Sequence, residues 1–133
     1  MSKHLFVQSL WTKFDSTNFN EASASFIQLI EKESRPLIIN LNKLKYFNDM
    51  WPICVGPLQN NTDKKSWQSK YENRWTLIGV SSNVKNIMEM FGFLDGWVKI
   101  IEKCPVCQEQ IDLNEAKCIN CGSYDVIEWK PLN

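Results

Sequence analysis

Residues 37–41 read Leu37-Ile38-Ile39-Asn40-Leu41, and this short stretch decides the fold class that the sequence predicts. Four of its five residues are large and aliphatic, and Pro36 stands directly before it. An apolar run of this length, bounded by a helix breaker, is typical of a buried central strand. We therefore expect a sheet that is covered by other elements.

The residues before this stretch predict a helix and, earlier still, strand structure. Residues 4–14 mix β-branched, aromatic and polar side chains, which favours one or two strands of a hairpin. Asn18 and Glu21 have the spacing of a capping box at the start of a helix. Apolar residues then recur at helical spacing up to about Glu33, at Phe19, Ala22, Phe26, Leu29 and Ile30. Strand, helix and strand in this order indicate a βαβ unit.

The residues after the stretch continue the alternation of strands and helices. Residues 64–73 predict a helical piece, and residues 75–80 predict another short strand. Ser81, Ser82 and Asn83 are suited to cap a helix with apolar residues at Val84, Ile87, Met88 and Phe91. The order of elements predicts an α/β sandwich of modest size.

The strongest motif in the sequence is a pair of Cys-x-x-Cys turns. The first is Cys104-Pro105-Val106-Cys107 and the second is Cys118-Ile119-Asn120-Cys121, with ten residues between them. Each such turn presents two thiolates, and four thiolates are the ligands of a structural tetrahedral Zn²⁺ site. Gly122 follows the fourth cysteine and suits the positive φ that such a knuckle often needs. Iron in a rubredoxin-like site and two disulfides are the alternatives to zinc.

The residues around the cysteines predict a small zinc ribbon. Residues 98–103 would enter the first knuckle, residues 108–117 would form a hairpin, and residues 124–129 alternate like a closing strand. Charge changes at the same place. Residues 1–101 carry twelve basic and nine acidic side chains, a net charge of +3, while residues 102–133 carry three basic and six acidic ones, a net charge of −3. We therefore predict two modules, an α/β domain over residues 1–101 and a zinc ribbon over residues 102–133.

Three segments of the first module resemble the STAS domain, the sulphate transporter and anti-sigma-factor antagonist family. These segments are residues 10–30, residues 37–49 and residues 77–94, and together they cover roughly residues 5–97. The resemblance implies a sandwich of a mixed sheet and helices. It also implies a non-catalytic regulatory module that binds a partner protein through the loop at Asp49, Met50 and Trp51 and the helix after it. The partner would be an anti-sigma-type kinase or another regulatory or transport subunit.

The sequence departs from the phosphoregulated members of that family at the loop itself. Those proteins carry a Ser or Thr phosphoacceptor after the Asp, whereas Asp49 is followed by Met50, Trp51 and Pro52. No hydroxyl stands at either acceptor position, so we expect an anti-anti-sigma-like protein without the phosphorylation switch.

An enzyme is not indicated by any motif. The sequence has one histidine, His4, near its start, and no Ser/His/Asp set, Gly-rich phosphate loop or HExxH motif. Asp15 and Asp49 are better explained by turns and caps than by acid–base chemistry, and Cys54 by a place in the core. We therefore expect a non-catalytic protein.

A nucleic-acid-binding zinc ribbon is the alternative function. Aromatic Trp67, Tyr71 and Trp75 alternate with basic residues and could stack on single-stranded nucleic acid, although a helix packed on the sheet explains them as well. The net charge of −3 over residues 102–133 opposes phosphate contacts there. We therefore expect a protein partner and no nucleic-acid partner.

The start of the sequence lacks the apolar run of a secretory signal, and no stretch is long and apolar enough to span a membrane. We therefore expect a cytoplasmic protein without a membrane span. In a reducing compartment, paired cysteines favour metal over disulfides.

Overall fold

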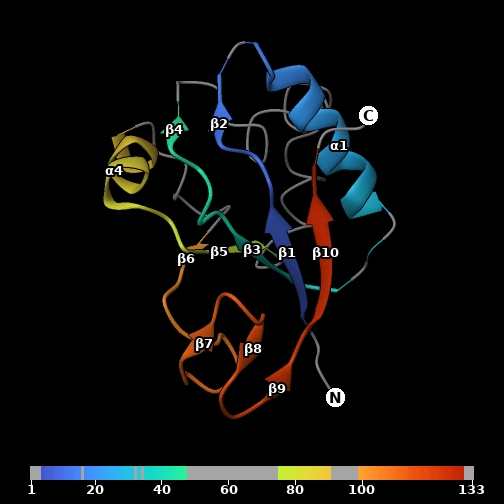
Figure 1. Cartoon of the computed structure of the whole chain (residues 1–133), viewed down its shortest axis with the longest axis vertical. Coiled ribbons are helices and arrows are strands. Elements are labelled where there is room, and N and C mark those ends of the chain that lie inside the picture. Colours follow the sequence, from blue (N-terminus) through green and yellow to red (C-terminus); the bar gives the residue numbers. More distant parts are fainter. Residues whose placement is uncertain are drawn as a thin grey trace, which may run out of the picture.

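The computed structural model of the chain describes residues 4–15, 17–31, 33, 35–47, 75–90 and 99–130. Its main feature is a five-stranded sheet with the strand order β10-β1-β3-β5-β6 (Figure 1). Every pairing in this sheet is parallel. The strands are β1 (Leu5–Ser9), β3 (Leu37–Asn40), β5 (Trp75–Ile78), β6 (Lys99–Ile100) and β10 (Asp125–Trp129).

Two smaller sheets and two helices complete the described structure. One small sheet is parallel and the other is antiparallel. They contain β2 (Lys13–Phe14) with β4 (Tyr46–Phe47), and β7 (Ile111–Asp112) with β8 (Lys117–Cys118) and β9 (Gly122–Ser123). The helices are α1 (Phe19–Glu31) and α4 (Ser82–Met90).

The α/β class and the βαβ unit expected from the sequence are confirmed, since β1 and β3 are parallel neighbours and the connection between them contains α1 as well as the short β2. Three details of the expectation are wrong. The mixed sheet is not seen, because the described strands of the main sheet are all parallel. Residues 4–14 form no hairpin, since β2 pairs with β4. The Asn18 side chain turns back to the Asp15 N–H at 2.9 Å, so it does not form the expected capping box.

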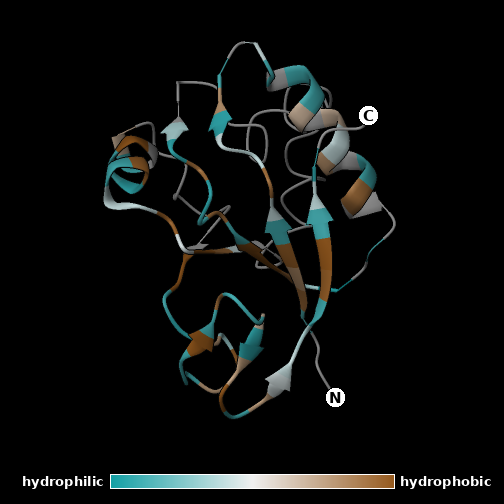
Figure 2. Cartoon of the chain, viewed as in Figure 1, coloured by the Kyte–Doolittle hydropathy of each residue, from teal (hydrophilic) through white to brown (hydrophobic). Residues whose placement is uncertain are grey.

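One face of the main sheet packs against the two helices. Alternate strand residues lie on this face because successive side chains of a strand point to opposite sides. They include Leu5 and Val7 of β1, and they form a core with Ala22 and Phe26 of α1 and with Val84 of α4. In Figure 2 the strands of this sheet carry much of the hydrophobic colour.

The opposite face is covered by the segment that contains the four cysteines. Phe6, Ile38 and Ile78, which alternate with the residues of the first core, pack against Ile111 and Tyr124 in a second cluster. Parallel sheets need cover on both faces, and helices usually supply it. Here the cysteine-rich segment takes the place of one helical layer.

The topology of the connections explains why this segment lies on that face. The α1 and α4 connections step in the same direction across the sheet and lie on the same face. The connection from β6 to β10 steps back in the opposite direction and lies on the other face. Because this connection differs from the other two in both direction and face, all three connections have the same handedness. The handedness rule for connections between parallel strands requires this.

The strand over residues 124–129, which we expected to close the ribbon, is instead an edge strand of the main sheet. Residues 125–129 form β10 and pair with β1 from Leu5 to Ser9. Trp129 is 1% exposed and lies against Phe14 and Phe26, with ring centroids 5.3 and 4.9 Å apart. Its indole N–H donates to the Ser25 hydroxyl of α1 at 2.8 Å. The main sheet therefore contains residues from both predicted modules, and the module boundary itself stays a prediction.

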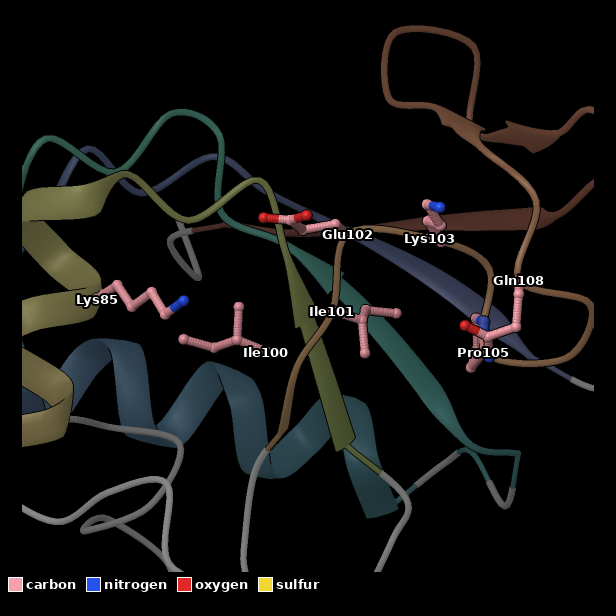
Figure 3. Close-up of a pocket in the computed structure, with 7 residues that line it drawn as sticks. All are labelled: Lys85, Ile100, Ile101, Glu102, Lys103, Pro105 and Gln108. Atoms are coloured by element: carbon pink, nitrogen blue, oxygen red, sulfur yellow. The ribbon is translucent and has the colours of Figure 1, made fainter.

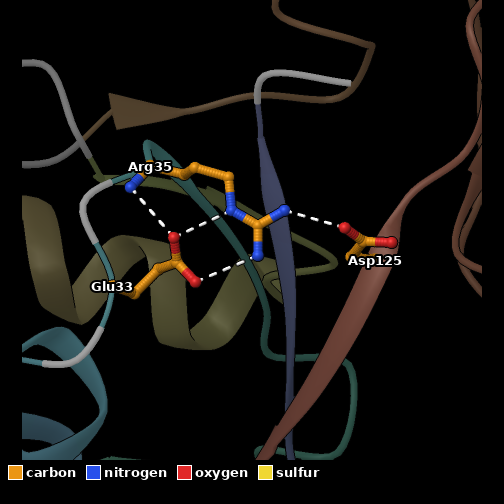
Figure 4. Close-up of polar contacts among 3 residues, drawn as sticks. All are labelled: Glu33, Arg35 and Asp125. Carbon is orange, nitrogen blue, oxygen red and sulfur yellow. Dashed lines mark hydrogen bonds and ion pairs between the residues drawn. The ribbon is translucent and has the colours of Figure 1, made fainter. Parts of the chain in front are cut away.

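An ion-pair network holds the start of β10 beside the segment that leads into β3 (Figure 4). The Arg35 guanidinium donates to the Asp125 carboxylate at 2.8 Å, and through two other nitrogens to the Glu33 carboxylate at 2.8 and 3.0 Å. The paired contact with Glu33 fixes the plane of the guanidinium. The ion pair of Arg35 with Asp125 therefore joins two residues that lie 90 positions apart in the sequence.

Candidate metal centre

The four cysteines of the two Cys-x-x-Cys motifs come together in the structure. Cys104 and Cys107 lie in the turn after β6, Cys118 ends β8, and Cys121 directly precedes β9. All four Sγ atoms lie within 4.8 Å of one another. The pairs 107–118, 107–121 and 104–121 are separated by 3.3, 3.5 and 3.9 Å. The predicted ligand set is therefore assembled at one point.

These distances fit the dimensions of a tetrahedral zinc site. Sulphur atoms about 2.3 Å from a zinc ion have edges of about 3.8 Å in a regular tetrahedron. The three separations lie on both sides of that value, and the four thiols are free rather than joined in disulfides. The cluster can therefore bind a metal ion such as zinc, with all four positions supplied by protein.

Both knuckles use a left-handed residue directly after their second cysteine. Gly122 has a φ of 92°, as the sequence led us to expect, and Gln108 has a φ of 66° at the equivalent place in the first knuckle. The first knuckle is closed by the Gln108 N–H, which donates to the Cys104 carbonyl at 2.9 Å. A non-glycine residue in this conformation is uncommon, and no signal in the sequence marked Gln108.

The cysteines differ in exposure. Cys104 and Cys118 are buried, Cys107 is half-buried and Cys121 is exposed. Cys104 and Cys118 therefore belong to the second core, while one side of the cysteine cluster faces solvent.

Burial and hydrogen bonding have opposite effects on the pKa of the Cys104 thiol. Burial raises the pKa of the Cys104 thiol, but hydrogen bonds from the Tyr124 hydroxyl and from the backbone N–H groups of Cys107 and Val106 outweigh burial and lower it to about 6. The contact with Cys107 and burial raise the pKa of Cys121 to about 12. A thiolate at Cys104 would be a ligand for a cation, and a bound cation would favour deprotonation of the other thiols.

Tyr124 connects the cysteine cluster to the sheet, and sequence reasoning missed this role. Its hydroxyl donates to the Cys104 Sγ at 3.1 Å, and its ring stacks on Phe6 of β1 with centroids 6.0 Å apart. Burial and the bond to Cys104 raise the pKa of the Tyr124 hydroxyl, which keeps it a donor. The signal available beforehand was only its place, three residues after the last cysteine.

The other residues singled out from the sequence lie apart from this centre or outside the described residues. Asp49, Met50, Trp51 and Cys54 fall outside the described part of the chain, as do Trp67 and Tyr71. Asp15 stabilises a turn by accepting the Thr17 N–H at 2.9 Å. His4 is half-buried, and burial lowers its pKa.

A shallow groove runs between α4, β6 and the first knuckle (Figure 3). Lys85 reaches toward it from α4, and Glu102 and Lys103 border it from the segment that connects β6 to the first knuckle. Among the residues that line this groove there is no cysteine, serine, histidine or second carboxylate that could complete a catalytic pair.

The chain matches no family model, no curated protein and no solved structure. Within the described ranges, no helix is long and apolar enough to cross a membrane. The resemblance to the STAS domain therefore stays a prediction from the three sequence segments.

Proposed function

We propose that this chain is a non-catalytic regulatory module for protein–protein interaction whose fold is held together by one structural zinc ion. The observation that carries the proposal is the cluster of four Sγ atoms within 4.8 Å, formed by the layer that covers the second face of the sheet. A site whose four ligands are all protein leaves no position for a water or substrate. The ion would therefore stabilise structure rather than perform chemistry.

The position of the cysteine cluster indicates that the ion would stabilise the connection between β6 and β10. The connection from Ile101 to Tyr124 contains only short strands, and its apolar residues form a small cluster with the sheet. Metal affinities of zinc-finger peptides correspond to about 10–16 kcal/mol, which is enough to hold such a segment folded. Zinc is preferred to iron because a closed four-thiolate ribbon is a common structural zinc site.

Native mass spectrometry of the purified protein tests the metal. We expect one zinc ion per chain and its loss in Cys107→Ser. A wild-type chain that carries no metal would contradict the structural role, and one iron atom per chain would replace zinc with the rubredoxin-like alternative.

The regulatory role is proposed from the STAS resemblance of residues 10–94. The partner would be an anti-sigma-type kinase or another regulatory or transport subunit, bound through Asp49, Met50 and Trp51. Because no phosphoacceptor follows Asp49, binding would be constitutive or controlled by something other than phosphorylation.

Affinity purification from the native host with mass spectrometry tests the partner. We expect a specific protein to be retained by the wild type and lost in the double variant Asp49→Lys with Met50→Asp. Asn114→Lys, at an exposed position between β7 and β8, is the control. Equal retention by the wild type and the double variant would exclude this loop as the contact, whether or not the metal is present.

A further inference from the structure

Among the described strands of the main sheet, β10 carries the exposed large apolar side chains. β10 lies at one margin of the sheet, next to β1 (Figure 1). Val126 is 52% exposed on the ribbon side and Ile127 is 39% exposed on the helix side, whereas their partners Phe6 and Val7 in β1 are buried. Apolar side chains therefore remain exposed on both faces of this edge strand.

The backbone of β10 offers free hydrogen-bonding groups along the same edge. The Leu10 N–H donates to the Trp129 carbonyl at 2.9 Å, so Asp125, Ile127 and Trp129 direct their backbone groups toward β1. Val126 and Glu128 alternate with them and direct theirs outward. No residue in the described part of the chain pairs with these outward groups.

The usual protections of an edge strand are weak here. β10 is five residues long, contains neither proline nor glycine, and pairs with β1 without a bulge. Its two acidic residues are Asp125, which Arg35 engages, and Glu128. An exposed, regular edge of this kind is a template for another strand.

We propose that a second copy of this chain pairs with β10 in antiparallel orientation, with Ile127 opposite Ile127 of the second copy on a two-fold axis. The alternation of backbone groups restricts the possible registers, because only outward-directed residues can exchange hydrogen bonds. In the proposed register, Val126 of each copy exchanges two bonds with Glu128 of the other. The dimer thus gains four backbone hydrogen bonds, and the two Ile127 side chains meet at a Cα separation of about 4.5 Å.

Neighbouring registers are less favourable. A shift that brings Glu128 opposite Glu128 places like charges in direct opposition, which destabilises a strand pair. A shift that brings Val126 opposite Val126 needs the Tyr124 N–H as a donor, and this group already donates to the Ala116 carbonyl at 3.0 Å.

Self-pairing is favoured over a foreign strand by the complementarity of this one register and by charge. The chain has a formal net charge of zero, so two copies do not repel each other over long distances. A two-fold interface needs one self-complementary patch, and β10 supplies it with an apolar residue at the centre and no like charges facing one another. The result would be a continuous sheet across two chains.

Light scattering coupled to size exclusion, followed by sedimentation equilibrium over a range of concentrations, tests the proposal with the full-length, metal-loaded protein. We expect the mass to approach twice the 15.6 kDa of the chain as concentration rises. Ile127→Lys places two cations in opposition on the axis and should raise the dimer dissociation constant by about tenfold or more.

An adjacent variant with the opposite expected outcome tests the register. Val126→Lys places lysine opposite Glu128 twice, so the dissociation constant should stay unchanged or fall by about two- to fivefold. Ile119→Lys, at a 70% exposed position on the second knuckle, is the matched control and should leave dimerisation unchanged. Circular dichroism and metal content establish that each variant is folded.

Three outcomes would overturn the proposal. A wild-type protein that is monomeric at all concentrations would exclude self-pairing, and the edge of β10 could then pair only with a strand of another protein. Loss of the dimer in both Ile127→Lys and Val126→Lys would indicate apolar association without the proposed register. A dimer that survives Ile127→Lys would lie elsewhere on the surface.

Discussion

At the scale of single residues, two glycines with positive φ differ in their surroundings. Gly79 has a φ of 74° and Gly122 a φ of 92°. A Cβ on Gly79 would lie 2.4 Å from the Oδ1 of Asn40, whereas a Cβ on Gly122 would have no atom within 4 Å. Asn40 is fully buried and its amide donates to the Gln8 side chain at 2.8 Å, so it has little freedom to move.

We therefore predict that Gly79→Ala destabilises the protein more than Gly122→Ala. Gly122→Ala should lower the free energy of unfolding only by the backbone strain, about 1–2 kcal/mol. Gly79→Ala should have a similar strain and, in addition, a clash with Asn40. Chemical denaturation of the metal-loaded variants measures both. Equal free energies of unfolding for the two variants would show that the Asn40 side chain moves to accommodate the added Cβ of Gly79→Ala.

Tyr124 carries a second prediction at the residue scale. Tyr124→Phe keeps the ring that stacks on Phe6 but removes the hydroxyl that donates to Cys104 at 3.1 Å. Because such outer contacts of metal ligands are worth about 10–100-fold in affinity, we expect zinc binding to weaken within that range. Competition with a chromophoric chelator measures the affinity, and Tyr46→Phe at an exposed position of β4 is the control. Unchanged zinc affinity in Tyr124→Phe would show that the Tyr124 hydroxyl does not contribute to metal binding.

At the scale of elements, β10 determines whether residues 1–101 can fold alone. The main sheet places β10 beside β1, and Trp129 fills the core between β1 and α1. Without residues 102–133, the sheet loses this strand, the Trp129 side chain and the cover over Phe6 and Ile38.

We predict that the fragment 1–101 lacks fixed tertiary structure, and that Trp129→Ala in the full chain costs about 3–5 kcal/mol. Near-ultraviolet circular dichroism of the fragment and denaturation of the variant are the measurements. Val126→Ala, on the exposed ribbon side of the same strand, is the control and should cost far less. A well-folded fragment would support the two-module organisation that the charge pattern suggested.

At the scale of the whole molecule, the metal centre and the sheet should lose stability together. Three residues separate Cys121 from β10, and Tyr124 among them contacts both Cys104 and Phe6. Removing the metal should therefore loosen the ribbon and also the pairing of β10 with β1.

Hydrogen exchange with and without a chelator measures this coupling. We expect protection to fall in residues 102–130 and also in β1, with a smaller change in α4, whose Val84 packs on the face of the sheet opposite the ribbon. Cys107→Ser should reproduce the pattern without a chelator. Loss of protection confined to residues 102–123 would show that β10 stays docked without metal.

Much of this structure follows from local pattern. The apolar run at residues 37–41 correctly indicated a buried strand, the residues after Gly79 correctly indicated a capped helix, and the cysteine spacing correctly indicated a four-thiol cluster. These features depend on neighbours a few positions apart. The alternation of residues 125–129 also indicated a strand, but its partner lies about 120 positions away and left no local signal.

The sequence by itself therefore determined the α/β class, the helix–strand order around residues 19–41 and the four cysteines that cluster, because periodicity and short spacings encode them. Only the tertiary structure decided that the cysteine-rich segment covers one face of the sheet, that β10 joins β1 and that Tyr124 reaches Cys104. The physical reason is that a parallel sheet must be covered on both faces. In this chain the cysteine-rich connection from β6 to β10 covers the second face, with the same handedness as the helical connections. No short stretch of residues specifies that arrangement.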